Sequence, residues 1–269
     1  MQPRIALYSL GVSLLLAASA AASLAQTSSS APSPTRDPQA VAVLQQSVVA
    51  MGTTIPSDST ATGTITTIAG SLTENGTITI LTRGTNQTSE QIQTPHGSTI
   101  VYSQGQASSV SGSTPTGLPM ERAVTSQCPS FPLALIADGL NNPDTAYSYV
   151  GLETLDTGTF HHIQIWNSFA TTPKLQAIAK FSVKDIWVDA KSSLPQKISY
   201  TRRDAGGASP GIAMAVSFSD YRNVGGVLYP FSIQESFNGT PWATITIQNV
   251  TFNTGLTDAN FPVQTAVAQ

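Results

Sequence analysis

Cysteine is nearly absent from the sequence, because Cys128 is the single one among 269 residues. One thiol excludes an intramolecular disulfide and a metal site built on a cysteine cluster. Its place deep in the chain also excludes lipid attachment at the cysteine of an export cleavage point. The sequence offers no base for a catalytic thiol, so we expect Cys128 to be a small buried hydrophobic residue.

Charged residues are scarce too, at 10% of the chain, with 12 basic and 15 acidic side chains and a formal net charge of −3. No basic run occurs. Because a phosphate backbone is bound by clustered Lys and Arg, we expect no nucleic-acid partner. Solubility must then come from Ser, Thr, Asn, Gln and Gly, which suits an exported, β-rich protein.

Long apolar runs are absent after the first residues of the sequence. Met1 and Arg4 precede the apolar stretch Ile5–Ala22, and Ser23-Leu24-Ala25 has small residues at the two positions that a signal peptidase reads. We expect residues 1–25 to be a signal peptide cleaved before Gln26, with an uncleaved membrane anchor as the alternative. The sequence therefore predicts an exported protein, periplasmic or secreted, with no stable membrane span after cleavage.

Catalytic motifs are missing as well. No Gly-x-Ser-x-Gly occurs, which removes the usual nucleophile turn of acyl-transfer enzymes. His161 and His162 are adjacent in a predicted strand and point to opposite faces, and His96 lies in a Pro-His-Gly turn, so they cannot easily share a metal. Asp185 and Asp189 lie on one strand face about 13 Å apart, farther than the paired carboxylates of glycosidases. We predict no catalytic residue, no metal site and no cofactor.

The remaining charged positions suggest surface roles. We expect Glu153 and Asp156, which flank a turn, to be surface charges, and His162 to pair across strands with a surface partner. Arg202-Arg203-Asp204 precedes the Gly/Ser-rich stretch Ala205–Gly211. It is interpreted as a solvated loop, with anion binding as the lesser alternative.

The chain organisation begins with residues 26–36, a Ser/Pro-rich stretch with too little apolar surface to fold and hence a predicted linker. Asp37-Pro38 is a helix start, in which a capping carboxylate precedes Pro at the first helical position. Apolar residues follow at helical spacing, and Gly52 is a plausible stop. A helix over Asp37–Met51 with one apolar stripe is predicted, and it must lie against another element.

The rest of the chain changes to the two-residue period of strands. We expect a flexible connection over Ser108–Pro119 and a second helix over Phe131–Leu140. Strands are predicted at 62–68, 76–82, 88–94, 98–103, 146–154, 160–167, 184–189, 196–201, 213–221, 229–237 and 243–252.

These elements predict an α+β domain over residues 37–264, followed by a short tail at 265–269. An antiparallel sheet of about ten strands must curl, because large flat sheets are disfavoured. We therefore expect a strongly curved sheet, a half-open β-barrel, with the helices covering its concave face.

The two-residue period also predicts which side chains face that concave side. These residues are either the lining of a hydrophobic ligand cavity or an ordinary filled core, and the sequence leaves both open. The candidates for ligand binding are Ile78, Ile80, Ile163, Ile165, Ile186, Val188, Val216, Phe218, Ile245 and Ile247.

Several strand-and-turn motifs in the C-terminal part carry a family resemblance. They are Asp185-Ile-Trp-Val-Asp189 with Leu194-Pro195, Val216-Ser-Phe-Ser-Asp-Tyr-Arg222 with Gly225-Gly226-Val-Leu-Tyr-Pro230, and the closing Asn253 and Asp258-Ala-Asn-Phe261. This block resembles the LolA-like, outer-membrane lipoprotein-sorting family. The resemblance implies a half-open barrel lidded by helices, whose known members bind acyl chains on the concave face.

The resemblance implies a non-enzymatic, exported protein that holds a lipid or another apolar ligand, or an acylated protein, between sheet and helices. One alternative is a structural or protein-interaction module of the cell envelope with a filled core and an unknown partner. A second alternative is a hydrolase with an unrecognised site, which a carboxylate or His96 in a cleft with a perturbed pKa would favour.

Overall fold

The computed structural model describes residues 35–84, 87–104, 107–111, 116–118, 130–155, 157–202 and 211–263. The predicted signal peptide, nearly all of the linker, the predicted tail, Cys128, Asp156, Arg203 and Asp204 lie outside these residues.

Thirteen described strands form one antiparallel sheet in the order β6-β5-β4-β3-β2-β1-β13-β12-β11-β10-β9-β8-β7. The sheet consists of two meanders, β1 to β6 and β7 to β13, which β1 and β13 join by pairing with each other. The strands are β1 (Asp58–Ala69), β2 (Leu72–Arg83), β3 (Gln87–Thr94), β4 (Gly97–Gln104), β5 (Ala107–Ser111), β6 (Thr116–Leu118), β7 (Thr145–Leu155), β8 (Gly158–Asn167), β9 (Lys184–Asp189), β10 (Pro195–Arg202), β11 (Ile212–Val224), β12 (Val227–Phe237) and β13 (Thr240–Phe252).

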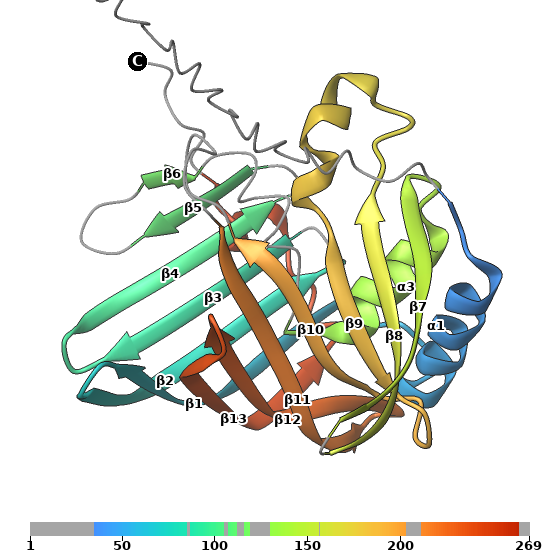
Figure 1. Cartoon of the computed structure of the whole chain (residues 1–269). Helices are drawn as coiled ribbons and strands as arrows, with labels where there is room; N and C mark the ends of the chain where they lie inside the picture. Colours follow the sequence, from blue (N-terminus) through green and yellow to red (C-terminus); the bar gives the residue numbers. More distant parts are fainter. Residues whose placement is uncertain are drawn as a thin grey trace, which may run out of the picture. The chain divides into compact units, whose positions relative to one another are not determined.

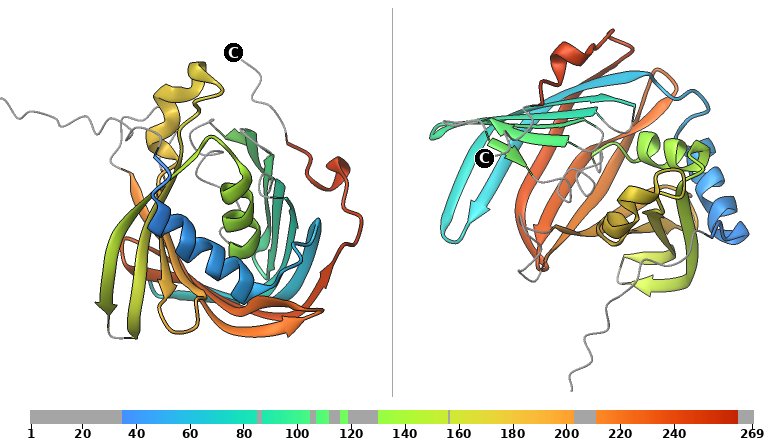
Figure 2. Two further views of the ribbon diagram at one scale, coloured as in Figure 1. Left: turned by 90° about the vertical axis from the view of Figure 1, so that its right-hand side faces the viewer. Right: turned by 90° about the horizontal axis from the view of Figure 1, so that it is seen from above.

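Two α-helices, α1 (Pro38–Met51) and α3 (Pro132–Asn141), lie against the concave side of the curved sheet, which wraps around them in Figure 2. Figure 1 shows both helices at the end of the sheet formed by β7 to β9. Two short 3-10 helices, η1 (Pro173–Phe181) and η2 (Asp258–Asn260), complete the described elements.

The first helix begins and ends where its sequence predicts. The Asp37 carboxylate accepts hydrogen bonds from the backbone N–H groups of Gln39 (2.8 Å) and Ala40 (3.3 Å), which satisfies two amides that the helix itself leaves free. Leu44 and Met51 are among its buried residues and face the core. Capping therefore fixes the start of α1, and the apolar stripe fixes its orientation.

The second helix is apolar almost all round. This composition fits its position, because α3 is buried more deeply than α1 and lies between α1 and the sheet. Phe131, just before it, stacks on Tyr229 with ring centres 5.1 Å apart and on Phe252 at 6.0 Å. At its other end Gly139 lies so close to Tyr147 that a Cβ atom would stand 2.7 Å from the phenol oxygen. This glycine permits the close approach of α3 to β7.

The predicted fold class, a strongly curved antiparallel sheet with helices over its concave face, is confirmed. The expectation of a flexible connection over Ser108–Pro119 is wrong in part, because β5 and β6 lie within it and extend the sheet beyond β4. Ser, Thr and Gly dominate these two strands, so they lack the apolar alternation that marks a strand in sequence. Among the described residues, no helix is both long enough and apolar enough to cross a membrane.

Candidate ligand-binding cavity

A cavity of about 500 Å³ lies on the concave side of the sheet, away from the helices. Residues of the first meander form one wall and residues of β10 to β13 form the other. The lining residues are Thr67, Ile68, Ala69, Glu74, Thr88, Glu90, Ile92, Thr94, Thr99, Val101, Ser103, Tyr200, Arg202, Met214, Glu235 and Trp242.

Strand register places these side chains on the inner face. Glu90 of β3 pairs with Ile80 of β2 and with Val101 of β4, and Ile80 belongs to the hydrophobic core. Glu235 of β12 likewise pairs with Val216 of β11, another core residue. Cross-strand partners point to the same face of a sheet. Both carboxylates therefore point inward, into the hollow.

The two carboxylates approach each other across the hollow and not along the sheet, because β2, β1 and β13 separate β3 from β12. Burial raises the pKa of Glu90, and the hydroxyl of Ser130 opposes this by donating a hydrogen bond of 2.9 Å to Oε1. Burial and then the nearby charge of Glu90 raise the pKa of Glu235 to about 8, against the opposing charge of Arg202. The pair therefore retains a proton at neutral pH.

Arg202 corrects a sequence-based interpretation. It was expected in a solvated loop, but it is the last residue of β10 and lines the cavity. It shares the inner face with Tyr200 and Ile198, two and four residues earlier, as the two-residue strand period requires.

The ten aliphatic and aromatic residues predicted to bind a ligand are all buried in the hydrophobic core, at 0 to 5% exposure. None of them lines the cavity at Glu90 and Glu235. Their strand faces were assigned as the structure has them, and contact with a ligand stays a prediction. The two glutamates are not among the residues predicted from the sequence. Glu235 interrupts an otherwise apolar inner face after Ile233, whereas Glu90 stands between Thr88 and Ile92 on a face that already mixes polar and apolar residues.

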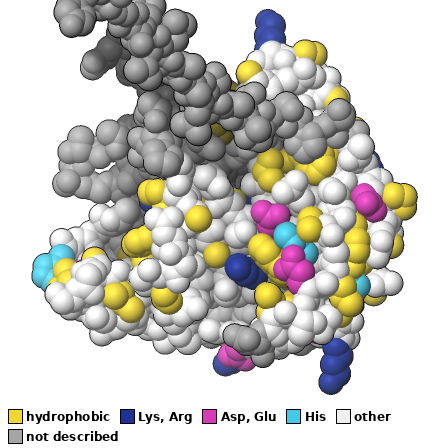
Figure 3. Space-filling model, viewed as in Figure 1, with side chains coloured by type: hydrophobic (Ala, Val, Ile, Leu, Met, Phe, Trp, Pro, Cys, Tyr) yellow, Lys and Arg dark blue, Asp and Glu magenta, His cyan; other side chains and the backbone are white. Residues whose placement is uncertain are grey.

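A second polar cluster lies on the convex face, over β7 to β10. His162 contacts Glu153 through Nδ1 at 2.6 Å and Asp185 through Nε2 at 2.9 Å. Its ring stacks on Trp187, whose Nε1 donates to Glu153 (2.8 Å) and whose ring lies under the Lys197 ammonium. Figure 3 shows acidic, basic and histidine side chains gathered over these strands.

This convex cluster confirms the predicted cross-strand pairing of His162 and shows that Glu153 and Asp185 are its partners. Because a neutral imidazole has only one N–H, both contacts are hydrogen bonds only in the charged ring. The stacked and paired side chains tie β7, β8, β9 and β10 together. No group of three or more potential ligand residues within the described part of the chain has the geometry of a metal site.

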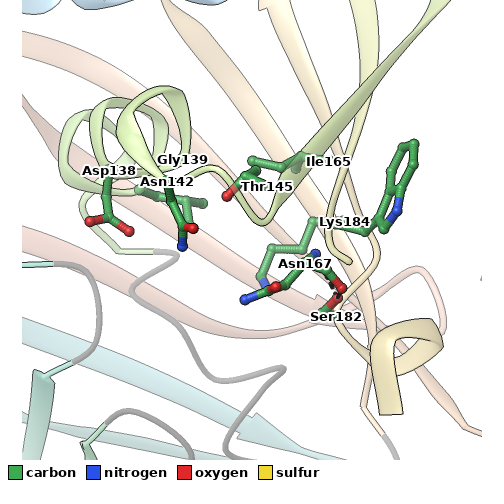
Figure 4. A pocket seen from close by; sticks show the side chains of 10 residues that line it. Asp138, Gly139, Asn142, Thr145, Ile165, Asn167, Ser182 and Lys184 are labelled. Carbon is green, nitrogen blue, oxygen red and sulfur yellow. Dashed lines mark hydrogen bonds between the residues drawn. The ribbon is translucent and has the colours of Figure 1, made fainter. Parts of the chain in front are cut away.

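A further depression of about 40 Å³ separates the end of α3 from β7 to β9. Figure 4 shows Asp138 and Asn142 from the end of α3 across from Asn167, Ser182 and Lys184. Such a volume holds a few water molecules and no acyl chain. The concave cavity is therefore the candidate site.

Comparison with known proteins supports the fold. No protein-family model matches the sequence, and no curated protein does. An outer membrane lipoprotein-sorting protein domain from Vibrio parahaemolyticus matches with a TM-score of 0.53 and 10% identity, over 83% of this chain and 96% of that one. A LolA superfamily protein from Nitrosomonas europaea matches with a TM-score of 0.54 and 13% identity, over 83% and 97%. The resemblance inferred from the strand-and-turn motifs is thus confirmed at the level of architecture: the chain has the LolA-like fold.

Proposed function

We propose that this chain is an exported, non-enzymatic carrier that holds a lipid or another apolar molecule in the concave cavity. The observation that carries the proposal is the cavity itself, whose volume of about 500 Å³ falls within the range of about 300–1,000 Å³ typical of small-molecule sites. Ile92, Val101, Met214 and Trp242 give it apolar walls.

The mechanism follows from transfer of the ligand out of water. Each methylene group of an acyl chain contributes about 0.8 kcal/mol when buried. The helices α1 and α3 act as lids in this proposal, and their opening would bring the chain into contact with the deeper core residues, including Ile78, Ile80 and Phe218. The ten predicted contact residues thus form the inner wall behind the lids.

The apolar stretch Ile5–Ala22 and the small residues before Gln26 support export. In this proposal residues 1–25 are the signal peptide, and residues 37–264 act as one domain in the periplasm or outside the cell. An acylated protein is a ligand of the same chemistry, since its lipid would enter the same cavity.

The test combines extraction with uptake. Protein purified from its host is extracted with organic solvent and the extract is analysed by mass spectrometry, and delipidated protein is titrated with a pyrene-labelled long-chain alcohol. We expect the wild-type protein to take up the probe saturably. Val101→Trp fills the cavity and should reduce the affinity for the probe at least about tenfold. Ile100→Trp, on the opposite face of β4, is the matched control and should bind normally.

Absence of both extracted lipid and probe uptake would overturn the proposal in favour of a structural or interaction module. Hydrolysis is the second candidate, and the two cavity glutamates favour it, because a carboxylic acid with a pKa near neutrality can act as a general acid. Turnover of nitrophenyl esters or glycosides that is lost in Glu235→Gln would identify this activity instead.

A further inference from the structure

The part of the cavity around Glu90 is more polar than an acyl chain requires. Glu90 of β3 and Glu235 of β12 line it together with a single cation, Arg202 of β10. Glu74 of β2 also lines the cavity, but it lies six residues along β2 from Ile80, the strand partner of Glu90. Glu74 also contacts His96 through a 2.5 Å pair at the edge of the sheet. Two carboxylates against one guanidinium give this part of the cavity an excess of acidic groups, which a purely apolar ligand would leave unused.

Two further polar atoms, one in each wall of the cavity, have no partner among the described residues. Ser103 is 2% exposed and its hydroxyl makes no hydrogen bond to any of them. The indole N–H of Trp242 is buried too, and it likewise makes no hydrogen bond to any described residue. Both side chains line the cavity. Leaving a buried donor or acceptor unsatisfied costs about 1–3 kcal/mol, so these atoms point to a ligand that supplies their partners.

We propose that the ligand is a long-chain amphiphile whose head group carries a protonated amine beside a hydrogen-bond acceptor such as a hydroxyl. The ammonium would lie between Glu90 and Glu235, and the acceptor would receive the Trp242 indole N–H and the Ser103 hydroxyl. The chain would run between Ile92 and Val101 of one wall and Met214 of the other. This inference rests on the proposed carrier function and specifies its ligand class.

The charges favour this head group over the head of a fatty acid. An ammonium offers three donors to the carboxylates, and charge-assisted hydrogen bonds are roughly twice as strong as neutral ones. A fatty-acid carboxylate would instead meet Glu90 and Glu235, with only Arg202 to compensate. Removing it from water beside like charges is costly.

The experiment compares three probes of equal chain length, dodecylamine, dodecanol and dodecanoate, titrated calorimetrically into delipidated protein below their micelle concentrations. We expect dodecylamine to bind most tightly and dodecanoate most weakly, with at least about a tenfold difference between them. Wild-type protein alone gives this order, so the result does not depend on any variant folding.

Variants then assign the preference to residues. Glu90→Gln and Glu235→Gln should each weaken dodecylamine binding about tenfold while changing dodecanol binding less than about threefold. Ser103→Ala should weaken dodecanol, whose hydroxyl can accept the Ser103 hydrogen bond, and should change dodecylamine little, because an ammonium has no acceptor. Asp220→Asn, an exposed carboxylate on β11, is the control and should change neither.

The outcomes separate the two proposals. If dodecanoate binds as well as dodecylamine, or if both glutamate variants keep the wild-type order, the amine assignment is wrong while the carrier function stands. If none of the three probes binds, the carrier function itself fails.

Discussion

At the scale of single residues, the pKa values of buried carboxylates are shifted in opposite directions at two places in the fold. Asp58 opens β1 and accepts hydrogen bonds from the Thr254 backbone (2.6 Å) and hydroxyl (2.8 Å) and from the Gly255 and Leu256 N–H groups. Burial raises its pKa, but these bonds outweigh burial and hold the pKa below its usual value. In the cavity, by contrast, the Glu90–Glu235 pair lacks comparable donors and stays partly protonated.

We predict that Asp58→Asn destabilises the fold by about 1–3 kcal/mol at neutral pH, because the amide cannot accept all four bonds as strongly. The folded-state pKa is below the unfolded one, so the contribution is present above the unfolded pKa and is lost as the pH falls through the folded pKa. Urea unfolding of the wild type and the variant measures the difference in free energy of unfolding at pH 7 and at pH 3.

The matched control is Asp220→Asn. Asp220 is exposed, pairs with Arg222 and has a left-handed backbone that Asn tolerates. Its change should stay within about 0.5 kcal/mol. An Asp58→Asn loss that is equally large at pH 3 would show that the charge is not the cause.

The sequence locates single residues well only where the local pattern decides their environment. The Asp37 cap and the burial of Ile186 and Val188 follow from neighbours in the chain, and the structure has them as predicted. Glu90 and Glu235 are different. Their pairing joins positions on strands that do not touch, so no spacing along the sequence could reveal it.

At the scale of elements, glycine decides how closely two strands lie. The register between β1 and β13 shifts between Thr62 and Gly63, where the ladder has a bulge. A Cβ atom on Gly63 would stand 2.2 Å from the Thr246 carbonyl oxygen of β13. Such a contact cannot be relieved by a side-chain rotation, since the neighbouring atom is backbone.

We therefore predict that Gly63→Ala destabilises the protein by about 2 kcal/mol or more, because the joint between the two meanders must open to admit the methyl group. Thermal unfolding followed by circular dichroism measures the shift. Thr64→Ala, the next residue on the exposed face, is the control and should change the midpoint little. Equal midpoints for the two variants would contradict the close approach.

Element positions were largely predictable from the sequence, and the exceptions have a physical reason. The predicted strands 184–189 and 196–201 match β9 and β10 closely because apolar and polar residues alternate there. The strands β5 and β6 were missed because their Ser-, Thr- and Gly-rich sequence carries no such alternation. Their pairing with β4 comes from backbone hydrogen bonds, which any residue except proline can make.

At the scale of the whole fold, the curvature of the sheet brings the charged side chains of the cavity together. Bending the sheet brings β3 and β12 face to face, so that Glu90, Glu235, Glu74 and Arg202 share one hollow. A flat sheet with the same register would keep these side chains apart. The raised pKa of Glu235 is thus a consequence of shape and not of its neighbours in the sequence.

We predict that the stability of the ligand-free protein falls as the pH rises from about 4.5 towards 8. The folded-state pKa of Glu235, about 8, exceeds its unfolded value, so the folded state holds the extra proton in this window and loses its advantage as the proton leaves. Glu74, Glu90 and Arg202 face the same hollow. The full shift of this pKa from 4.5 to about 8 corresponds to a loss of about 5 kcal/mol at most.

Glu235→Gln should reduce the pH dependence of the free energy of unfolding, because the amide cannot ionise. Urea unfolding between pH 5 and pH 9 measures this pH dependence for the wild type and for the variant. Asp220→Asn is again the control and should show the wild-type slope. Parallel profiles for wild type and Glu235→Gln would show that another group sets the pH response.

The pairing of β1 with β13 also governs when the fold can be completed. All other strand pairs in the sheet join neighbours in the sequence, but this one joins Ser59 to Phe252. Such distant pairing raises the contact order and slows folding, since the entropy of closing the intervening chain is lost before the contact forms. During synthesis the edge of β1 that pairs with β13 therefore stays unpaired until β13 has left the ribosome, which makes the first meander the segment most in need of protection from aggregation.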